Sequence, residues 1–261
     1  MHYTGEQVEA SASAWAPQNE SDWHALAARE EEMKAQCARR GVVSSYHQGA
    51  NSTLKSGGWC LGAKPAARWQ APRAAGQHSI PGVHVPADEA LVDALLRYVL
   101  RSPEGLRSIN DFGAGVGQYG HSLLAREPSL RYRGYDGAGD VREYTDGFVK
   151  FVDLTMPLSL PRADWVLSME VGEHVPHEHE MMFVRNLHAH NCRGLVLSWA
   201  QLEQLGTAHV NTHSLEYVLS LFSSLGYSCN RSATHALRRK ASFLWLRRNL
   251  VVFDRMTPTC L

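Results

Sequence analysis

The sequence predicts an α/β protein: a Rossmann-like, seven-stranded, mostly parallel sheet with helices on both faces, preceded by an N-terminal helical and loop-rich cap. Two observations predict this fold. From Pro86 onward, short apolar and β-branched runs alternate with helical stretches, which is the pattern of βαβ units. The chain before Pro86 lacks this alternation. We therefore expect a cap or lid segment over residues 1–82 and a Rossmann-like domain over residues 83–261.

The N-terminal segment divides into a charged helical part and a loop-rich part. Residues 20–40 are rich in Ala, Glu, Lys and Arg, with apolar residues at near-helical spacing, which predicts one or two amphipathic helices. Residues 44–82 are dense in Gly, Ser, Pro and Gln and contain Trp59 and Trp69. Ordering such a loop requires a packing partner, so we expect residues 40–82 to fold over a ligand crevice. Packing elsewhere or a dimer contact is the alternative.

The second part of the chain begins with a capped helix and continues as alternating strands and helices. Asp88 is a good N-cap residue, and Leu91, Leu95 and Val99 form one apolar stripe, which predicts a helix here. Further helices are expected up to residue 124, over residues 177–190 and over residues 214–225. The predicted strands are residues 108–112, 131–136, 149–153, 164–169, 194–199 and 244–254.

The balance of charges and the scattered cysteines argue against several classes of protein. Lys plus Arg and Asp plus Glu each number 26, so bulk charge would not hold the chain to nucleic acid or to an anionic membrane. No apolar run reaches the roughly 18 residues of a membrane span, and the polar start lacks the order of a secretory signal. Five cysteines without a CxxC pair are typical of reduced thiols. We expect a cytoplasmic protein without a disulfide framework or a zinc site.

The most specific motif is a glycine loop between a predicted strand and a helix. Residues 111–120 read Asp-Phe-Gly-Ala-Gly-Val-Gly-Gln-Tyr-Gly. Glycine lets bare backbone approach a ligand, and a helix N-terminus aims N–H groups at it. The loop has an acidic residue followed by G-x-G-x-G, which differs from the dinucleotide-binding spacing. The charge of Asp111 suits an ammonium group better than a pyrophosphate.

Two further acidic residues end the next predicted strands. Asp136 is placed to accept hydrogen bonds from both hydroxyl groups of a ribose. Asp153 is placed to accept from an exocyclic amine such as that of adenine. Because the carboxyl ends of parallel strands meet at one edge of the sheet, we expect the glycine loop and both carboxylates to line one crevice.

These motifs, over about residues 108–255, resemble the class I methyltransferases that use S-adenosylmethionine. The resemblance implies that the glycine loop holds the methionine part of the cofactor, Asp136 its ribose, and Asp153 with Leu154 its adenine edge. An NAD-binding Rossmann domain and a nucleotide-free α/β domain are the alternatives. The cofactor-binding residues expected on this basis are Asp111, Gly113, Ala114, Gly115, Gly117, Tyr119, Asp136, Gly137, Asp153, Leu154 and Met169.

A second motif follows the fourth predicted strand and should face the same crevice. Residues 168–176 are similar to the E-x-x-E-H signature of ubiquinone-pathway O-methyltransferases and of small-RNA 3′-end 2′-O-methyltransferases, and we expect Glu170, Glu173 and His174 to be catalytic. The resemblance implies a divalent metal bound by these three residues, joined in the RNA family by a later histidine that corresponds to His213. Glu-His pairs at this place also serve metal-free enzymes. The sequence therefore leaves a divalent metal open and favours a metal-free role for His174.

The methyl acceptor is expected to bind between this segment, the cap and the loop after the fifth strand. The sequence predicts a methyltransferase acting on an O or N atom of a small molecule, with no membrane or nucleic-acid partner. A metal-assisted RNA 3′-end 2′-O-methyltransferase is one alternative, but an extended basic surface is missing. A non-catalytic cofactor-binding module is another, although it would have no need for the three acidic residues. The candidate substrate-binding residues are Tyr46, Trp59, His209, Asn211 and His213.

Overall fold

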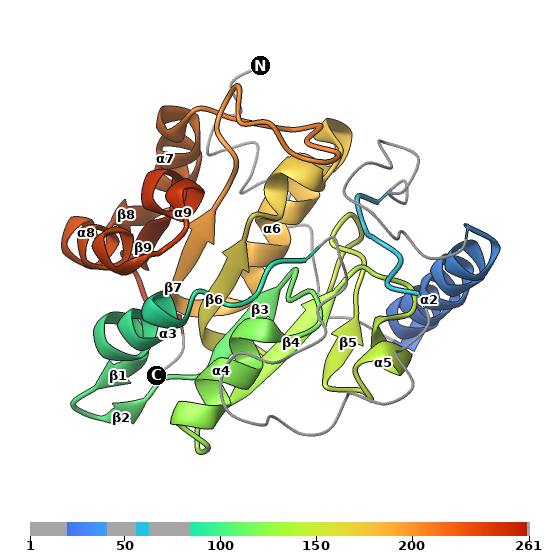
Figure 1. Cartoon of the computed structure of the whole chain (residues 1–261), viewed down its shortest axis with the longest axis horizontal. Coiled ribbons are helices and arrows are strands. Elements are labelled where there is room, and N and C mark those ends of the chain that lie inside the picture. The colour runs from blue at the N-terminus through green and yellow to red at the C-terminus, as the bar shows by residue number, and fades with distance from the viewer. Residues whose placement is uncertain (1–19, 41–55, 63–83, 260–261) are drawn as a thin grey trace.

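The computed structural model describes residues 20–40, 56–62 and 84–259 of the chain. Its main sheet consists of β3 (Ile109–Phe112), β4 (Tyr132–Asp136), β5 (Val149–Phe151), β6 (Ala163–Met169), β7 (Asn191–Ser198), β8 (Tyr227–Cys229) and β9 (Val251–Arg255). In space these strands follow the order β5-β4-β3-β6-β7-β9-β8 (Figure 1). Neighbouring strands are parallel, except that β9 runs antiparallel to β7 and to β8. The predicted seven-stranded, mostly parallel sheet is confirmed.

Helices cover both faces of the sheet, because successive side chains of a strand point to opposite faces. In β9, Val251 and Phe253 pack on one face and Val252 packs on the other. The first face is covered by α6 (Glu180–Ala189) and α7 (Leu215–Ser224), and the second by α3 (Glu89–Leu95), α4 (Gln118–Arg126), α8 (Arg231–Lys240) and α9 (Leu244–Asn249).

No helix in the described ranges is long and apolar enough to span a membrane.

The predicted N-cap at Asp88 is confirmed and explains where α3 begins. The Asp88 carboxylate accepts a hydrogen bond from the backbone N–H of Leu91 at 3.2 Å, which satisfies one of the free N–H groups of the first turn. Leu91, Leu95 and Val99, the predicted apolar stripe, are all buried. The elements between α3 and β3 are the π-helical turn η2 (Leu96–Leu100) and a hairpin of β1 (Arg101–Ser102) and β2 (Gly105–Leu106).

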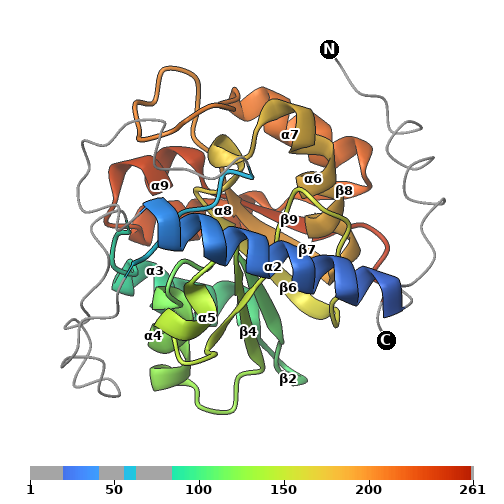
Figure 2. The same cartoon turned by 90° about the vertical axis from the view of Figure 1, so that its right-hand side faces the viewer.

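One long helix, α2 (Glu20–Arg40), forms the charged part of the N-terminal segment, as predicted. It lies along the β5 edge of the sheet and crosses the front of the molecule in Figure 2. Its backbone packs so closely on Gly139 that a Cβ added there would lie 2.4 Å from a backbone atom of the helix. An ion pair between Lys34 and Glu143 joins it to α5 (Val141–Tyr144). The helix is therefore part of the folded domain.

A disulfide bond joins Cys37 on α2 to Cys60 in the segment 56–62. The expectation that all cysteines are reduced thiols is therefore wrong. The two residues lie 23 positions apart, and only the packing of α2 against the segment brings them together, which spacing alone does not reveal. Cys192 is also disulfide-bonded, whereas Cys229 is free.

The C-terminal stretch corrects one predicted strand. Residues 244–254 form α9 followed by β9, where the sequence predicted one continuous strand. Leu246 and Asn249 are buried three positions apart while the two arginines between them are exposed, which is helical spacing. The preceding residues, 226–243, for which the sequence predicted no element, contain β8 and α8.

Candidate functional site

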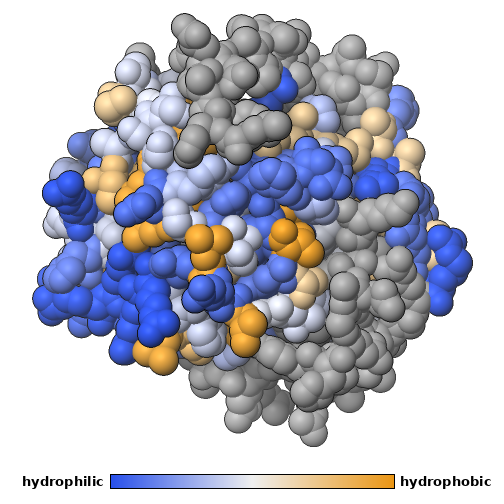
Figure 3. Space-filling view, turned by 90° about the horizontal axis from the view of Figure 1, so that it is seen from above, coloured by the Kyte–Doolittle hydropathy of each residue, from blue (hydrophilic) through white to orange (hydrophobic). Residues whose placement is uncertain are grey.

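A pocket of about 300 Å³ lies at the carboxyl ends of the parallel strands. Its walls come from the turns that follow β3, β4, β5, β6 and β7, and from residues 56–59, His84 and Phe243 outside the sheet. This edge is where open α/β sheets bind ligands, and the volume suits a small ligand. Figure 3 looks down on the side that carries the loop after β7, where hydrophobic side chains lie scattered among hydrophilic ones in the coloured part of the surface.

The glycine loop adopts a backbone that requires glycine. Gly113, Gly115 and Gly117 have φ values of 79°, 58° and 83°, in the left-handed region that side chains disfavour. A Cβ at Gly113 would also lie 2.3 Å from the side chain of Val171. The N–H groups of Gly113 and Ala114 both donate to the Tyr135 carbonyl, which holds the loop against β4. Bare backbone therefore borders the pocket.

Two buried carboxyl groups flank this loop. Asp136 accepts hydrogen bonds from the N–H groups of Gly115 at 2.7 Å and Ala138 at 2.9 Å, and burial still raises its pKa to about 6. Burial raises the pKa of Asp111 to about 7, although the Tyr132 hydroxyl donates to it at 2.8 Å; the charge of Asp136 adds to the rise. A ligand with positive charge and hydroxyl groups would stabilise both carboxylates, and S-adenosylmethionine has both.

The third predicted carboxylate, Asp153, is already paired. It is 1% exposed and borders the pocket, and one of its oxygens accepts from Nε of Arg29 on α2 at 2.7 Å. The other oxygen accepts from the N–H and the hydroxyl of Thr155. Helix α2 thus reaches the end of the pocket that the resemblance assigns to adenine.

The residues after β6 take three different positions. Glu170 has a φ of 53°, and its carboxylate accepts from the side chains of Gln204 at 2.9 Å and Asn249 at 3.2 Å. It therefore ties β6 to the loop after β7 and to α9. Glu173 is 0% exposed, and burial, helped by the charge of Glu170, raises its pKa well above the usual range. Burial lowers the pKa of His174 to about 4, so its ring is neutral at pH 7.

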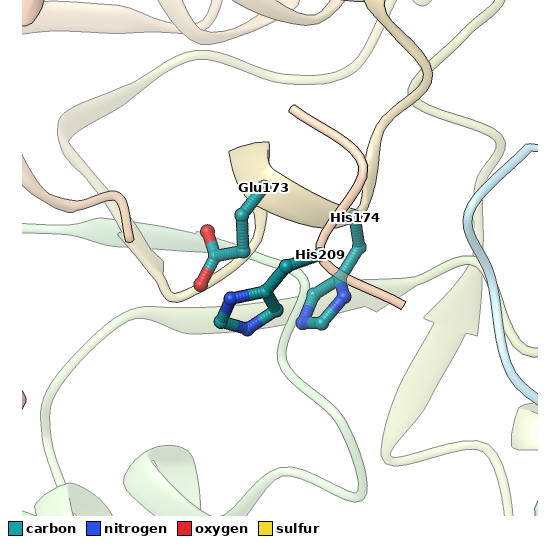
Figure 4. A group of neighbouring side chains, drawn as sticks. All are labelled: Glu173, His174 and His209. Carbon is teal, nitrogen blue, oxygen red and sulfur yellow. The ribbon is translucent and has the colours of Figure 1, made fainter. Parts of the chain in front are cut away.

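A histidine from the loop after β7 completes this end of the pocket. Figure 4 shows the side chains of Glu173, His174 and His209 turned toward one another. One carboxyl oxygen and one nitrogen of each ring lie within 4.8 Å of one another. The ring of His174 also meets the edge of Trp59, with 5.7 Å between the ring centroids. A residue of the predicted cap therefore touches the predicted catalytic segment.

Most of the predicted site residues lie around this one pocket. Of the predicted cofactor residues, all except Gly117 line it, and Gly117 instead precedes the first turn of α4. Tyr46 falls outside the described residues. The other predicted residues that line the pocket are Glu170, Glu173, His174, Trp59 and His209.

Asn211 and His213 are not among the residues that line the pocket. Both bind the buried carboxylate of Glu180, Asn211 through its amide at 3.0 Å and His213 through Nε2 at 2.6 Å. The Tyr217 hydroxyl donates to the other oxygen of Glu180. The structure thus separates His213 from Glu170, Glu173 and His174, with which the resemblance grouped it.

Several residues at or beside the pocket were not predicted from the sequence; three with polar side chains are His84 and Gln204, which line it, and Arg29, which pairs with Asp153. His84 packs on the glycine loop, where a Cβ at Gly115 would lie 2.7 Å from its ring, and burial lowers its pKa to about 4. Gln204 lies on the loop after β7. The expectation that this loop faces the crevice, which pointed to His209, could also have pointed to Gln204. Nothing in the sequence distinguishes Arg29 from the other charged residues of α2.

No protein-family model and no curated protein matches this sequence, but solved structures do. The sugar N-methyltransferase KedS8 from Streptoalloteichus sp ATCC 53650 is similar, with 16% identity and a TM-score of 0.51 over 70% of this chain and 99% of that chain. Magnesium protoporphyrin IX methyltransferase (ChlM) from Synechocystis PCC 6803, with bound S-adenosylhomocysteine, has 18% identity and a TM-score of 0.45 over 64% of this chain and 83% of that chain.

The sheet topology and the likeness to KedS8 agree with what the glycine loop and the spaced acidic residues predict. Identities this low show a shared fold and leave the activity to be argued from the site. The chain has the Rossmann-like fold of the class I S-adenosylmethionine-dependent methyltransferases.

Proposed function

We propose that this protein transfers a methyl group from S-adenosylmethionine to an O or N atom of a small molecule. One observation carries the proposal. A single pocket joins the glycine loop and the two raised-pKa carboxyls Asp111 and Asp136 to the polar group of Glu173, His174 and His209. The first end offers what a cationic nucleoside needs, and the second offers groups that can bind an acceptor's O–H or N–H.

The cofactor, when bound, supplies an electrophilic methyl group. The residues of the chain then contribute mainly binding and orientation, which account for much of the rate in such transfers. Asp111 holds the charged end against the bare backbone of the glycine loop, and Asp136 accepts from the ribose hydroxyls. At the other end, Glu173, His174 and His209 are placed to bind the acceptor and to help remove its proton.

We propose further that residues 1–82 form a cap that closes the pocket, with residues 83–261 as the catalytic domain. The described part of the cap supports this, because residues 56–59 line the pocket and Arg29 pairs with Asp153. A pocket of about 300 Å³ with Trp59 in its wall favours a small acceptor over a polymer. Cap closure would also exclude water from the reacting groups.

Calorimetry with S-adenosylmethionine, S-adenosylhomocysteine and NAD tests the cofactor. We expect the first two to bind in the micromolar range or tighter and NAD to bind far more weakly. Tight NAD binding without a response to S-adenosylmethionine would refute the proposal.

Methyl transfer is then measured with a methyl-labelled donor, offered either a small-molecule extract or RNA. We expect label in the small-molecule fraction. Label in RNA alone would instead favour the RNA methyltransferase, and tight cofactor binding without transfer to either would favour a non-catalytic module.

A further inference from the structure

The carboxyl group of Glu173 is buried, and no cationic side chain in the described ranges compensates for its charge. The residue lies in the short turn η3 (Gly172–His174) after β6, is 0% exposed, and borders the pocket. Within the described part of the chain, no donor stands at full hydrogen-bonding geometry to either carboxyl oxygen; the carboxyl of Glu170 and the backbone of Ala200 interact with this group more weakly, and Glu170 adds to the cost of its charge. Burying a carboxylate is costly unless another group compensates for its charge. A cation bound at this carboxyl would supply that compensation.

The two histidines beside it are oriented by backbone carbonyl groups. Nδ1 of His174 lies 3.2 Å from the carbonyl oxygen of Ala208, and Nδ1 of His209 lies 2.9 Å from that of Gln204. Because a carbonyl oxygen can only accept, Nδ1 of each ring donates the hydrogen bond and carries a proton. Nε2 of each ring is then the nitrogen left to serve as a ligand. Fixing a ring through its other nitrogen is how proteins orient histidines that bind metals.

The segments that carry these three groups are joined by their backbones. The carbonyl oxygen of Glu173 accepts from the N–H groups of Val210 at 2.8 Å and Asn211 at 3.0 Å. These bonds hold the loop after β7 against the turn after β6. The carboxyl group and the two rings are therefore positioned before any ligand arrives, and Figure 4 shows them converging.

We propose that Glu173, His174 and His209 bind one divalent first-row transition-metal ion, such as Zn²⁺, Mn²⁺ or Fe²⁺, at the acceptor end of the pocket. Two imidazoles and one carboxylate suit these ions, whereas Mg²⁺ and Ca²⁺ prefer oxygen ligands alone. The set differs from the one that the sequence resemblance implied. His213 binds Glu180 instead, both oxygens of Glu170 accept from Gln204 and Asn249 although its carboxyl lies beside that of Glu173, and His209 takes part.

Three protein ligands leave part of the ion's coordination free, as in catalytic metal sites. The free positions would face the pocket, because all three residues border it. An acceptor hydroxyl or amine bound there would have its pKa lowered. This role rests on the proposed methyl transfer, whereas the binding of the ion does not.

A second group of possible ligands, His177, Glu180 and His213, serves as an internal comparison. The carboxyl oxygens of Glu180 already accept from Asn211, His213 and Tyr217. Its charge is therefore compensated without an ion. His177 is exposed, so its replacement should leave the fold intact.

The test uses the full chain, stripped of metal with a chelator and titrated with Co²⁺ and Zn²⁺ in the absence of cofactor and acceptor. We expect one equivalent to bind and bound Co²⁺ to show a visible spectrum. His174→Ala and His209→Ala should each weaken binding at least about tenfold and change that spectrum. Glu173→Gln should have the same effect, provided that its melting curve shows a folded protein. If Glu173→Gln does not fold, His209→Ala carries the test, because His209 lies on a loop.

His177→Ala is the matched control and should bind the ion like the wild type. The proposal is wrong if the wild type binds no equivalent, or if His177→Ala loses the ion while His209→Ala keeps it. Because the titration contains no methyl donor, metal binding and methyl transfer are measured separately, and either can fail without the other. Full methyl transfer by the metal-free protein would overturn the role of the ion toward the acceptor.

Discussion

At the residue scale, burial holds Asp111 and Asp136 in a state that a ligand can change. Their pKa values, about 7 and about 6, lie above the ordinary value of 3.8. These groups therefore favour the folded protein most below pH 4, and this contribution is lost as the pH rises through 6 and 7. A bound cation favours the carboxylate form and lowers both pKa values.

Binding of S-adenosylmethionine should therefore release protons near pH 6.5. Calorimetry in two buffers of different ionisation enthalpy measures the release, and we expect it to vanish by pH 9, where both groups are already ionised. Asp111→Asn should reduce the release at pH 6.5 and weaken binding by about 1–3 kcal/mol. A binding enthalpy that does not depend on the buffer at pH 6.5 would contradict this coupling.

The glycine loop and its flanking carboxylates could be predicted because local sequence determines them. The left-handed φ of Gly113 favours glycine whatever the rest of the chain does. The pattern of predicted strands places Asp136 at the carboxyl edge of the sheet. Two other features depend on distant packing. The partner of Asp153 is Arg29, 124 residues away, and the burial of Glu173 becomes visible only with the structure. The sequence favoured a metal-free site because it shows neither that burial nor the contact with His209.

At the element scale, the segment 56–62 fits closely against two walls of the pocket. A Cβ added to Gly58 would lie 2.4 Å from the carbonyl oxygen of Gly137, and one added to Gly57 would lie 2.2 Å from that of His174. Both contacts are with backbone atoms, which do not give way as a flexible side chain does. The two glycines thus allow the cap to lie directly on the cofactor and acceptor ends of the pocket.

Gly58→Ala should displace this segment and raise the dissociation constant for S-adenosylmethionine severalfold. Trp59 should also lose its contact with His174, and tryptophan fluorescence can follow this change. Gly105→Ala is the control, because its positive φ imposes strain while the added Cβ meets nothing within 4 Å. An unchanged dissociation constant in a folded Gly58→Ala protein would show that the segment does not shape the cofactor site.

Most elements of the sheet domain could be predicted because their apolar periodicity is strong. The prediction for residues 244–254 was wrong because Leu244, Trp245 and Leu246 form an apolar run that is typical of a strand. Tertiary contacts decide this case: Leu246 and Asn249 point inward at helical spacing, and Asn249 binds Glu170. Short apolar runs do not distinguish a buried helix from a strand by periodicity.

At the scale of the whole molecule, the disulfide bond between Cys37 and Cys60 joins α2 to the segment 56–62, the two described parts of the cap. Leu61 and Gly62, next to Cys60, donate backbone N–H groups to the carboxylate of Asp140, which ties the cap to the sheet domain. The cytoplasmic location stays a prediction. The disulfide bonds remove one of its reasons, which was that the cysteines would be reduced.

Replacing Cys37 and Cys60 together by serine should lower the free energy of unfolding by about 2–4 kcal/mol. Cofactor affinity should fall as well, because residues 56–59 line the pocket. Denaturant unfolding and calorimetry measure the two effects. Cys229→Ser, which removes a free thiol, is the control. Equal stability of the double variant and the control would show that the bond is not needed to hold the cap.

The place of β9 in the sheet has a consequence for how the protein is made. β9 is the last described strand in the sequence but lies between β7 and β8, and β8 has no other neighbour in the sheet. Strands β3 to β7, which carry the glycine loop and the carboxylates, can pair while translation continues. The edge of β7 stays uncovered until residues 251–255 leave the ribosome. Because α9 is made just before that stretch, the glycine loop and its carboxylates can form before Glu170 gains its contact with Asn249.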